Sequence, residues 1–354
     1  DVTEFRRVLF RSTVPVSVEA WSVPCAVVAH HLGLSPRYLA TLNLAGASGV
    51  AMIHHAAQAI ASGQATTVLC VAGQNLLSNA KKADPVKAMA ESGVAHPEHE
   101  IPHGPLVPSL YALIAQRHMH EYGTTPEQLA EISAAIRGHG ALNPRAHKRE
   151  AVGVADVLAS RMITSPLHVL DCSLVSDGAC AVIVTSAERA RDLPRRPVRL
   201  LGQGYGLSHS YVGEARQVTT TGAVRSGRDA FASAGLTHAD VDVAQIYDCF
   251  SITVLVELED LGFCAKGDGG RFVSDGNLIS GVGKLPFNTD GGGLCNNHPA
   301  NRGGMTKVIE AVRQLRGEAH PAVQVPGCQL ALAQGMGGLL GSRHGSATLI
   351  LERA

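Results

Sequence analysis

Among the 17 histidines and six tyrosines of this sequence, two are candidates for proton transfer. His298 lies in a loop rich in Gly and Asn, directly before a proline. Its neutral imidazole can act near neutral pH as a base or as a donor to a developing oxyanion. Tyr247 ends an apolar segment. With an ordinary pKa of about 10, a tyrosine donates a proton without any shift but needs a nearby charge to act as a base.

Two cysteines offer a second kind of chemistry. Cys295 lies three residues before His298, and Cys249 lies two residues after Tyr247. A thiol beside a base becomes a nucleophile. A free cysteine among apolar residues usually serves as a small core side chain. The sequence leaves both interpretations open, because it does not show which sulfur comes within hydrogen-bond distance of the imidazole.

Composition excludes several other classes of function. Lys plus Arg and Asp plus Glu number 30 each, and this zero net charge argues against a nucleic-acid binder. The eight cysteines are scattered without a C-x-x-C pair, so we expect no zinc site, no disulfide framework and a reducing cytoplasm. His54 and His55 are adjacent but lack a third metal ligand. No apolar run approaches the roughly 18 residues of a membrane span.

The candidate residues are set in a chain of 354 residues that alternates helical and strand patterns, which is typical of α/β layers. Residues 48–62 are rich in Ala and apolar on most faces, which predicts a buried helix that ends at Gly63. Thr125 followed by Pro126 predicts the start of another helix. We expect buried strands at 66–72, 180–185, 241–247 and 346–351.

A charged, Pro-rich segment at 187–197 predicts a boundary between two similar halves. We assign residues 13–190 to an N-terminal half and residues 191–354 to a C-terminal half, and we leave 1–12 unassigned. The N-terminal half includes a polar excursion or lid at about 74–165, punctuated by Pro and Gly.

Four segments, in this order, resemble motifs of the thiolases, in particular those of the sterol-carrier-protein type. They are similar to the nucleophile loop, a strand-to-loop motif, the loop that ends in Gly-His-Pro, and a C-terminal glycine loop: residues 43–49, 246–251, 288–299 and 331–338. The resemblance implies a five-layer αβαβα fold of two similar halves, a homodimer, and a coenzyme A thioester as substrate with no covalently bound cofactor. The family begins with a further strand and helix before the equivalent of Val14. Residues 1–12 do not resemble these elements, so we expect them to stand apart from the fold.

Both thiols of the family are absent from the matched positions. Gly46 stands at the place of the nucleophilic cysteine, and Ala331 at the place of the second cysteine. His298 matches the catalytic histidine, and Tyr247 stands where the family carries His or Asn. The resemblance therefore implies the thiolase fold without the covalent route.

The remaining parts suffice for retro-aldol cleavage of a 3-hydroxyacyl-CoA, with His298 and Tyr247 as catalytic residues. Gly46 and Ser48 at the helix start, and Gly335 to Gly337 with Met336 between them, are the expected substrate-binding residues, because glycines let a thioester oxygen approach backbone amides. Thiolase-like aldolases of steroid side-chain degradation lack the cysteine in this way and work with a partner built from a zinc ribbon and an OB-fold. Two alternatives are an acetyl-CoA acetyltransferase-type enzyme that uses another residue, and a non-catalytic subunit that binds acyl-CoA or lipid.

Overall fold

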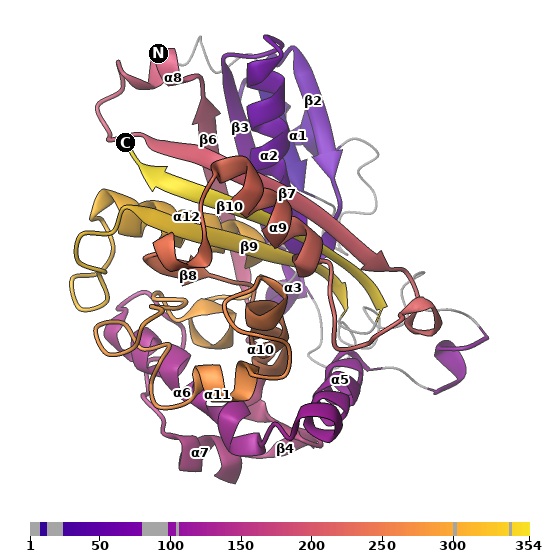
Figure 1. Ribbon diagram of the computed structural model, residues 1–354. Coiled ribbons are helices and arrows are strands. Elements are labelled where there is room, and N and C mark those ends of the chain that lie inside the picture. Colours follow the sequence, from indigo (N-terminus) through magenta and orange to yellow (C-terminus); the bar gives the residue numbers. More distant parts are fainter. Residues whose placement is uncertain (1–7, 13–23, 80–97, 104–105, 300–302, 340–341) are drawn as a thin grey trace.

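Two four-stranded sheets form the centre of the molecule (Figure 1). The computed structural model describes residues 8–12, 24–79, 98–103, 106–299, 303–339 and 342–354. The first sheet has the strand order β2 (Tyr38–Leu42), β1 (Val8–Ser12), β3 (Thr67–Asn75), β6 (Asp177–Thr185). The second has the order β7 (Val198–His209), β10 (Ser342–Arg353), β9 (Leu330–Leu339), β8 (Val243–Gln245).

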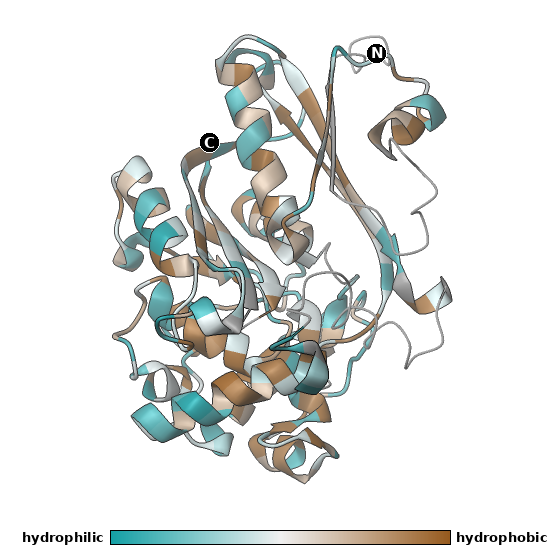
Figure 2. Cartoon of the chain, turned by 90° about the vertical axis from the view of Figure 1, so that its right-hand side faces the viewer, coloured by the Kyte–Doolittle hydropathy of each residue, from teal (hydrophilic) through white to brown (hydrophobic). Residues whose placement is uncertain are grey.

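Helices fill the space between the sheets and cover their outer faces. α2 (Ser48–Ala61) and α12 (Gly303–Arg316) pack against each other and against both sheets. α1 (Pro24–His31) contacts the outer side of the first sheet, and α9 (Ala223–Ala234) covers the second. The turned view in Figure 2 shows the helix layer between the two sheets. The expected five-layer αβαβα fold is confirmed.

The composition of α2 explains its central place. Eight of its residues are buried and five are alanines, so neighbouring elements approach closely. At Gly49 a β-carbon would lie 2.4 Å from the backbone nitrogen of Met305, which allows only glycine where α2 crosses α12. Gly63 has a left-handed φ of 72° and follows the end of the helix, as the sequence predicts.

A second group of helices lies below the second sheet (Figure 1) and supports the loops described below. It comprises α5 (Val107–Tyr122), α6 (Pro126–Leu142), α7 (Val154–Ala159), α10 (Ser251–Asp260) and α11 (Gly269–Val273), beside the short hairpin β4 (Met162–Thr164) and β5 (Leu167–His168). α6 begins with the predicted Thr125 cap, here completed by Gln128 as a capping box. All ten residues of α10 are buried, so this helix anchors the group to the core.

A strand lies at each predicted place, two in each sheet, and the one expected at 241–247 is limited to Val243–Gln245. The burial expected for 180–185 is wrong, because β6 lies at the edge of the first sheet and its side chains are exposed or half-buried. One expectation about the start of the chain is wrong, because Val8–Ser12 pairs in parallel with both β2 and β3 inside the first sheet. Of the expected lid, residues 80–97 and 104–105 lie outside the described residues, and much of 106–165 is helical. The boundary near 190 stays a prediction. At this place the chain leaves β6, forms the short helix α8 (Ala187–Ala190) and enters β7. Elsewhere in the first half, the short helix α3 (Leu76–Asn79) follows β3.

No helix in the described part of the chain is long and apolar enough to cross a membrane. The eight cysteines are free thiols. Among the residues that the structure describes, no group of three or more His, Cys, Asp or Glu side chains is placed to hold a metal ion.

Candidate active site

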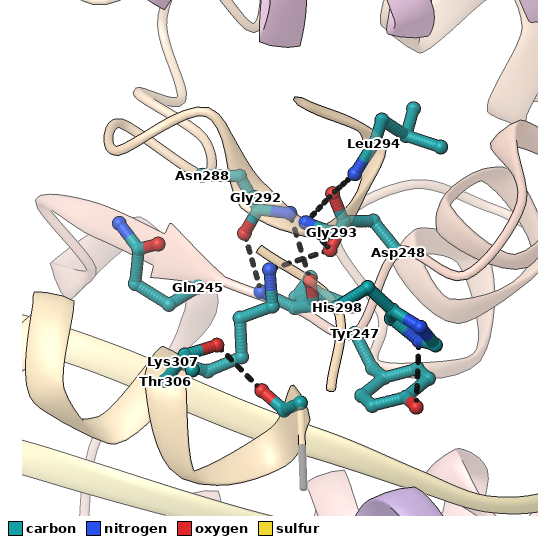
Figure 3. Close-up of polar contacts among 12 residues, drawn as sticks. Gln245, Tyr247, Asp248, Asn288, Gly292, Gly293, Leu294, His298, Thr306 and Lys307 are labelled. Atoms are coloured by element: carbon teal, nitrogen blue, oxygen red, sulfur yellow. Dashed lines mark hydrogen bonds and ion pairs between the residues drawn. The ribbon is translucent and has the colours of Figure 1, made fainter. Parts of the chain in front are cut away.

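Tyr247 and His298 meet at the end of β8. The phenol oxygen of Tyr247 lies 2.9 Å from Nε2 of His298, and Figure 3 shows the ring and the imidazole pointing toward each other. Tyr247 is 5% exposed, while His298 is partly exposed. The two candidate proton carriers, 51 positions apart in the chain, therefore form one hydrogen-bonded pair.

The backbone at Tyr247 is fixed by two buried amide side chains. Asn288 accepts a hydrogen bond from the Ile246 amide at 3.0 Å and donates one to the Ile246 carbonyl at 2.9 Å. Gln334 on β9 accepts a hydrogen bond from the Tyr247 amide at 3.2 Å. These bonds satisfy backbone groups just beyond β8, where the sheet ladder has ended. The strand end can thus present the tyrosine without a continuing strand.

The loop of His298 is held by Asp248, the neighbour of Tyr247. Its carboxylate accepts hydrogen bonds from the amides of Gly293, at 2.8 Å, and Leu294, at 3.3 Å, and forms an ion pair with Lys307. On the other side, the amide of His298 donates to the hydroxyl of Ser176 at 3.0 Å. The imidazole is therefore held on a loop that is tied at both ends.

Gly46 lies against the ring of Tyr247. A β-carbon at this position would lie 2.3 Å from the carbonyl oxygen of Met336 and 2.5 Å from Cζ of Tyr247. Ordinary contacts of a β-carbon are about a full ångström longer. The tyrosine ring and the β9 backbone thus fill the space that a side chain at position 46 would need.

Ser48 is used inside the turn that precedes α2. Its hydroxyl donates to the Ala45 carbonyl at 2.6 Å and accepts from the Leu44 amide at 2.9 Å. Its side chain is fully buried. Both bonds stay within the turn in which Gly46 lies and hold its shape, so the expected substrate-binding role of Ser48 stays a prediction.

The predicted glycine loop near the C-terminus is a strand, so that expectation is wrong. Residues 331–338 lie within β9, paired with β10. Gly335 and Gly337 let this strand approach the turn before α2: their β-carbons would lie 2.9 Å from the Gly46 carbonyl and 2.2 Å from the Leu44 carbonyl. Met336 between them is 1% exposed. The strand contributes backbone beside Gly46, which leaves the expected thioester-binding role of these residues a prediction.

The matched position of the second cysteine lies in the interior of the second sheet. Ala331 pairs with Val243 and is fully buried in the core, four residues before Tyr247 along the neighbouring strand. Gln334, which contacts the Tyr247 amide, is the part of β9 that reaches the site.

The two alternative nucleophiles are buried and turned to other partners. The Cys295 thiol donates to the Gly291 carbonyl at 2.9 Å, and burial raises its pKa to about 12. The Cys249 thiol lies 3.4 Å from the Thr253 hydroxyl, and burial likewise raises its pKa to about 12. A thiol with such a pKa is protonated at neutral pH and does not attack a thioester.

The imidazole of His298 is neutral at physiological pH. Although the residue as a whole is partly exposed, its imidazole is enclosed by protein atoms. This burial, with a smaller contribution from the charge of Lys307, lowers the pKa of His298 to about 4. A neutral imidazole has a free lone pair on one nitrogen, so Nε2 can accept the phenol proton of Tyr247. The pair can therefore take a proton from a substrate hydroxyl and return it to a carbon or oxygen atom.

Sequence reasoning missed four residues that build the site: Asp248, Asn288, Lys307 and Gln334. Lys307 is the clearest case, because it is 2% exposed. The one signal in the sequence is a lysine on the apolar face of the helical pattern at 303–314, and long side chains at such positions usually reach solvent. Asp248 and Asn288 lie inside segments that carry the family resemblance, but the resemblance gave them no role.

Both parts of the chain match families of known proteins. Residues 9–154 match the Thiolase, N-terminal domain, and residues 204–353 match the Thiolase C-terminal domain-like family. The chain is 38% identical over 318 residues to an acetyl-CoA acetyltransferase of Methanothermobacter thermautotrophicus, covering 90% of this chain and 81% of that protein. The chain belongs to the thiolase superfamily.

Its relatives place it in the branch of sterol-carrier-protein-type thiolases and thiolase-like aldolases. It is 38% identical over 293 residues to the 17-hydroxy-3-oxo-4-pregnene-20-carboxyl-CoA lyase of Mycobacterium tuberculosis, over 79% of this chain and 74% of that one. The solved structure of an Ltp2-ChsH2(DUF35) aldolase superposes with a TM-score of 0.83 at 31% identity, covering 98% of this chain and 87% of that one. The protein is thus a thiolase-like enzyme of acyl-CoA carbon–carbon bonds.

Proposed function

We propose that this protein cleaves a 3-hydroxyacyl-CoA by a retro-aldol reaction, without a covalent intermediate. The observation that carries the proposal is the Tyr247 phenol, which fills the space beside Gly46 and lies 2.9 Å from the neutral His298. A proton-transfer pair thus stands where thiolases keep their nucleophile. The names of the lyase and aldolase relatives support the same reaction class.

The reaction needs only the groups already described. The β-hydroxyl gives its proton to the phenol of Tyr247 as the phenol proton passes to Nε2 of His298. The electron pair of the O–H bond forms the carbonyl of a ketone or aldehyde, and the pair of the Cα–Cβ bond moves to the thioester as an enolate. The proton then returns through Tyr247 to the enolate carbon, which yields the shorter acyl-CoA. Backbone amides near Gly46 and Gly335 are the proposed donors to the enolate oxygen.

Acyl transfer is the less favoured candidate. It needs a thiolate or another nucleophile within reach of His298. Gly46 has no side chain, and the thiols of Cys249 and Cys295 are buried and protonated. A non-catalytic subunit that binds acyl-CoA or lipid remains the third candidate, and turnover distinguishes it from the first two.

The proposal extends to partners. The similar aldolase structure contains a second component, named ChsH2(DUF35). We infer a comparable zinc-ribbon/OB-fold partner for this chain, and the name of a steroid side-chain-cleaving aldolase from Thermomonospora curvata supports a sterol-derived acyl chain. A homodimer in the cytoplasm is part of the same proposal.

The direct test is turnover of a 3-hydroxyacyl-CoA with a tertiary β-hydroxyl, by the protein co-purified with any small subunit from its native source. We expect a ketone and a shorter acyl-CoA by mass spectrometry, and negligible thiolysis of a 3-ketoacyl-CoA. His298→Ala and Tyr247→Phe should each lower kcat by roughly 10²–10⁴-fold. Tyr205→Phe is the matched control. Tyr205 lies on β7, at the opposite edge of the second sheet from β8, and its hydroxyl donates to the Ala51 carbonyl at 3.1 Å.

Three results would decide against the proposal. Unchanged rates in both site variants would refute the site. An acyl group trapped on the wild-type protein would favour the acyltransferase. Tight binding of acyl-CoA without turnover, with the partner present, would favour the non-catalytic subunit.

A further inference from the structure

One buried ion pair lies next to the proposed catalytic pair without taking part in it. Asp248 is 1% exposed and Lys307 2% exposed, and the two side chains contact each other directly. Both carboxylate oxygens of Asp248 also accept the Gly293 amide, each at 2.8 Å. Figure 3 shows this carboxylate between the ammonium group and the loop.

Each partner of this ion pair is connected to Tyr247 or His298 through the backbone. Asp248 follows Tyr247 in the chain, and the Gly293 that it binds packs against the imidazole: a β-carbon there would lie 3.1 Å from Cδ2 of His298. Lys307 belongs to α12, whose first residue is Gly303. A β-carbon at Gly303 would lie 3.0 Å from the Tyr247 ring and 3.5 Å from the imidazole. The ion pair therefore joins the three segments that meet at the site.

Stability alone is a weak reason for such a pair. Desolvation offsets much of the attraction of a buried ion pair, and apolar residues of similar volume often replace one without loss. Burial raises the pKa of Asp248, and the Lys307 charge and the Gly293 amide oppose that rise. An ionised carboxylate at this place thus depends on Lys307, and the loop of His298 depends on the carboxylate.

We propose that Asp248 and Lys307 are a positioning pair, which holds the His298 loop against Tyr247 and sets the electrostatic field in which the imidazole accepts the phenol proton. The pair acts through His298 and Tyr247 and does not touch substrate. Its catalytic consequence rests on the proposed lyase function, but its effect on His298 does not.

The segments packed against the His298 loop carry several charged and titratable groups. Tyr247 and Asp248 lie on the loop after β8, Lys307 on α12, and Asp290 on the loop of His298 itself. The facing segment carries Cys172 and holds His298 through Ser176. Among these groups, the positive charge of Lys307 lowers the pKa of His298 and so favours the neutral imidazole.

The test is a titration of His298 by NMR of imidazole-labelled protein, with the resonance assigned by its loss in His298→Gln. In Lys307→Gln the amide can still donate to Asp248 while the positive charge is gone. The midpoint should therefore rise by about one pH unit. In Asp248→Asn the Lys307 charge is uncompensated, so the midpoint should fall, and the ¹⁵N signature of an Nε2 acceptor should weaken as the loop loses its clamp. Lys307→Arg should restore the wild-type titration.

Lys266→Gln is the matched control, since it removes a partly buried lysine that is likewise paired with carboxylates, those of Glu259 and Asp260. It should leave the His298 titration unchanged. If Lys307→Gln does not fold, the Asp248→Asn titration carries the test alone. A wild-type midpoint and Nε2 signature in either folded variant would overturn the proposal. A shifted titration in a protein without lyase activity would uphold the positioning pair and refute the proposed function instead.

Discussion

At the scale of single residues, Gly46 and Tyr247 determine which chemistry the site can perform. The ring of Tyr247 and the Met336 carbonyl both lie within 2.5 Å of the place of a β-carbon at position 46. Gly46→Cys should therefore fail to restore thiolysis and should destabilise the fold by about 1–3 kcal/mol through overpacking. Gly138→Ala is the control, because nothing lies within 4 Å of its β-carbon position.

Thermal unfolding and a thiolysis assay check this expectation. Adding Tyr247→Asn to Gly46→Cys should relieve the contact with the ring but leave that with the Met336 carbonyl. A stable Gly46→Cys protein whose new thiol is alkylated rapidly, or which cleaves a 3-ketoacyl-CoA, would show that the site opens more easily than its geometry indicates.

The pH dependence of the reaction follows from His298. Because the folded-state pKa is lowered to about 4, the imidazole keeps its neutral, proton-accepting form at all higher pH values. Activity should thus stay constant as the pH is lowered from neutral, and it should decrease only as the pH drops through about 4. A pH profile of kcat/KM measures this. A loss of kcat/KM with a midpoint near the ordinary histidine pKa of about 6.5 would contradict this expectation. It would show that the imidazole is more solvated, or feels less positive charge, than the structure indicates.

The sequence identified the proton carriers but not what holds them. His298 could be found because a histidine in a glycine loop matches a family motif, and Tyr247 because it stands at the strand end where the family carries His or Asn. Lys307 could not be found, because its burial results from α12, the loop after β8 and the loop of His298 meeting in space. Sequence spacing predicts which face of a helix is apolar, but not that an ammonium group on that face meets a carboxylate 59 positions away.

At the scale of elements, the loop after β8 depends on Asn288. This residue has a positive φ of 40° and bonds both backbone groups of Ile246. Asn288→Ala removes both bonds and should cost about 1–3 kcal/mol of unfolding free energy. It should also lower kcat, because the strand end no longer fixes Tyr247. Denaturant unfolding and steady-state kinetics measure the two effects.

Asn277 offers a matched control for that prediction. Its side chain also makes two backbone contacts, with Phe272 at 2.7 Å and Lys284 at 3.0 Å, in the segment after α11, and neither contact involves the loop of Tyr247. Asn277→Ala should destabilise the protein to a similar degree with an unchanged kcat. Equal losses of kcat in the two variants would show that stability, and not the position of Tyr247, limits the rate.

Elements with strong local signals could be predicted, and those set by tertiary contacts could not. The Thr125 cap and Gly63 mark helix ends through local hydrogen bonds and backbone conformation. Residues 331–338 carry several glycines, a composition typical of a loop. They form a strand because β10 supplies the hydrogen bonds and because small residues are required where β9 approaches the Leu44 and Gly46 carbonyls.

At the scale of the whole molecule, the first sheet ends at β6. In the described part of the chain only β3 pairs with this strand of nine residues, and its outward side carries exposed Ala179, Ala181 and Ile183. An edge strand with apolar residues and no charge along its middle invites pairing with another strand. We expect two copies to join β6 to β6 in antiparallel fashion, which a two-fold axis requires.

The predicted homodimer can be tested through this edge. Sedimentation at micromolar concentration should give a dimer for the wild type, and Ala181→Pro with Ile183→Lys should give a monomer, because proline removes a backbone donor and lysine places a charge on the contact. Ile163→Lys is the control: this residue is also exposed, at 38%, but lies on β4. A dimer that survives the β6 changes and dissociates with Ile163→Lys would move the interface to the helical group. Because β6 begins next to Ser176, which holds His298, a monomer with reduced kcat would further show that the edge contact supports the site.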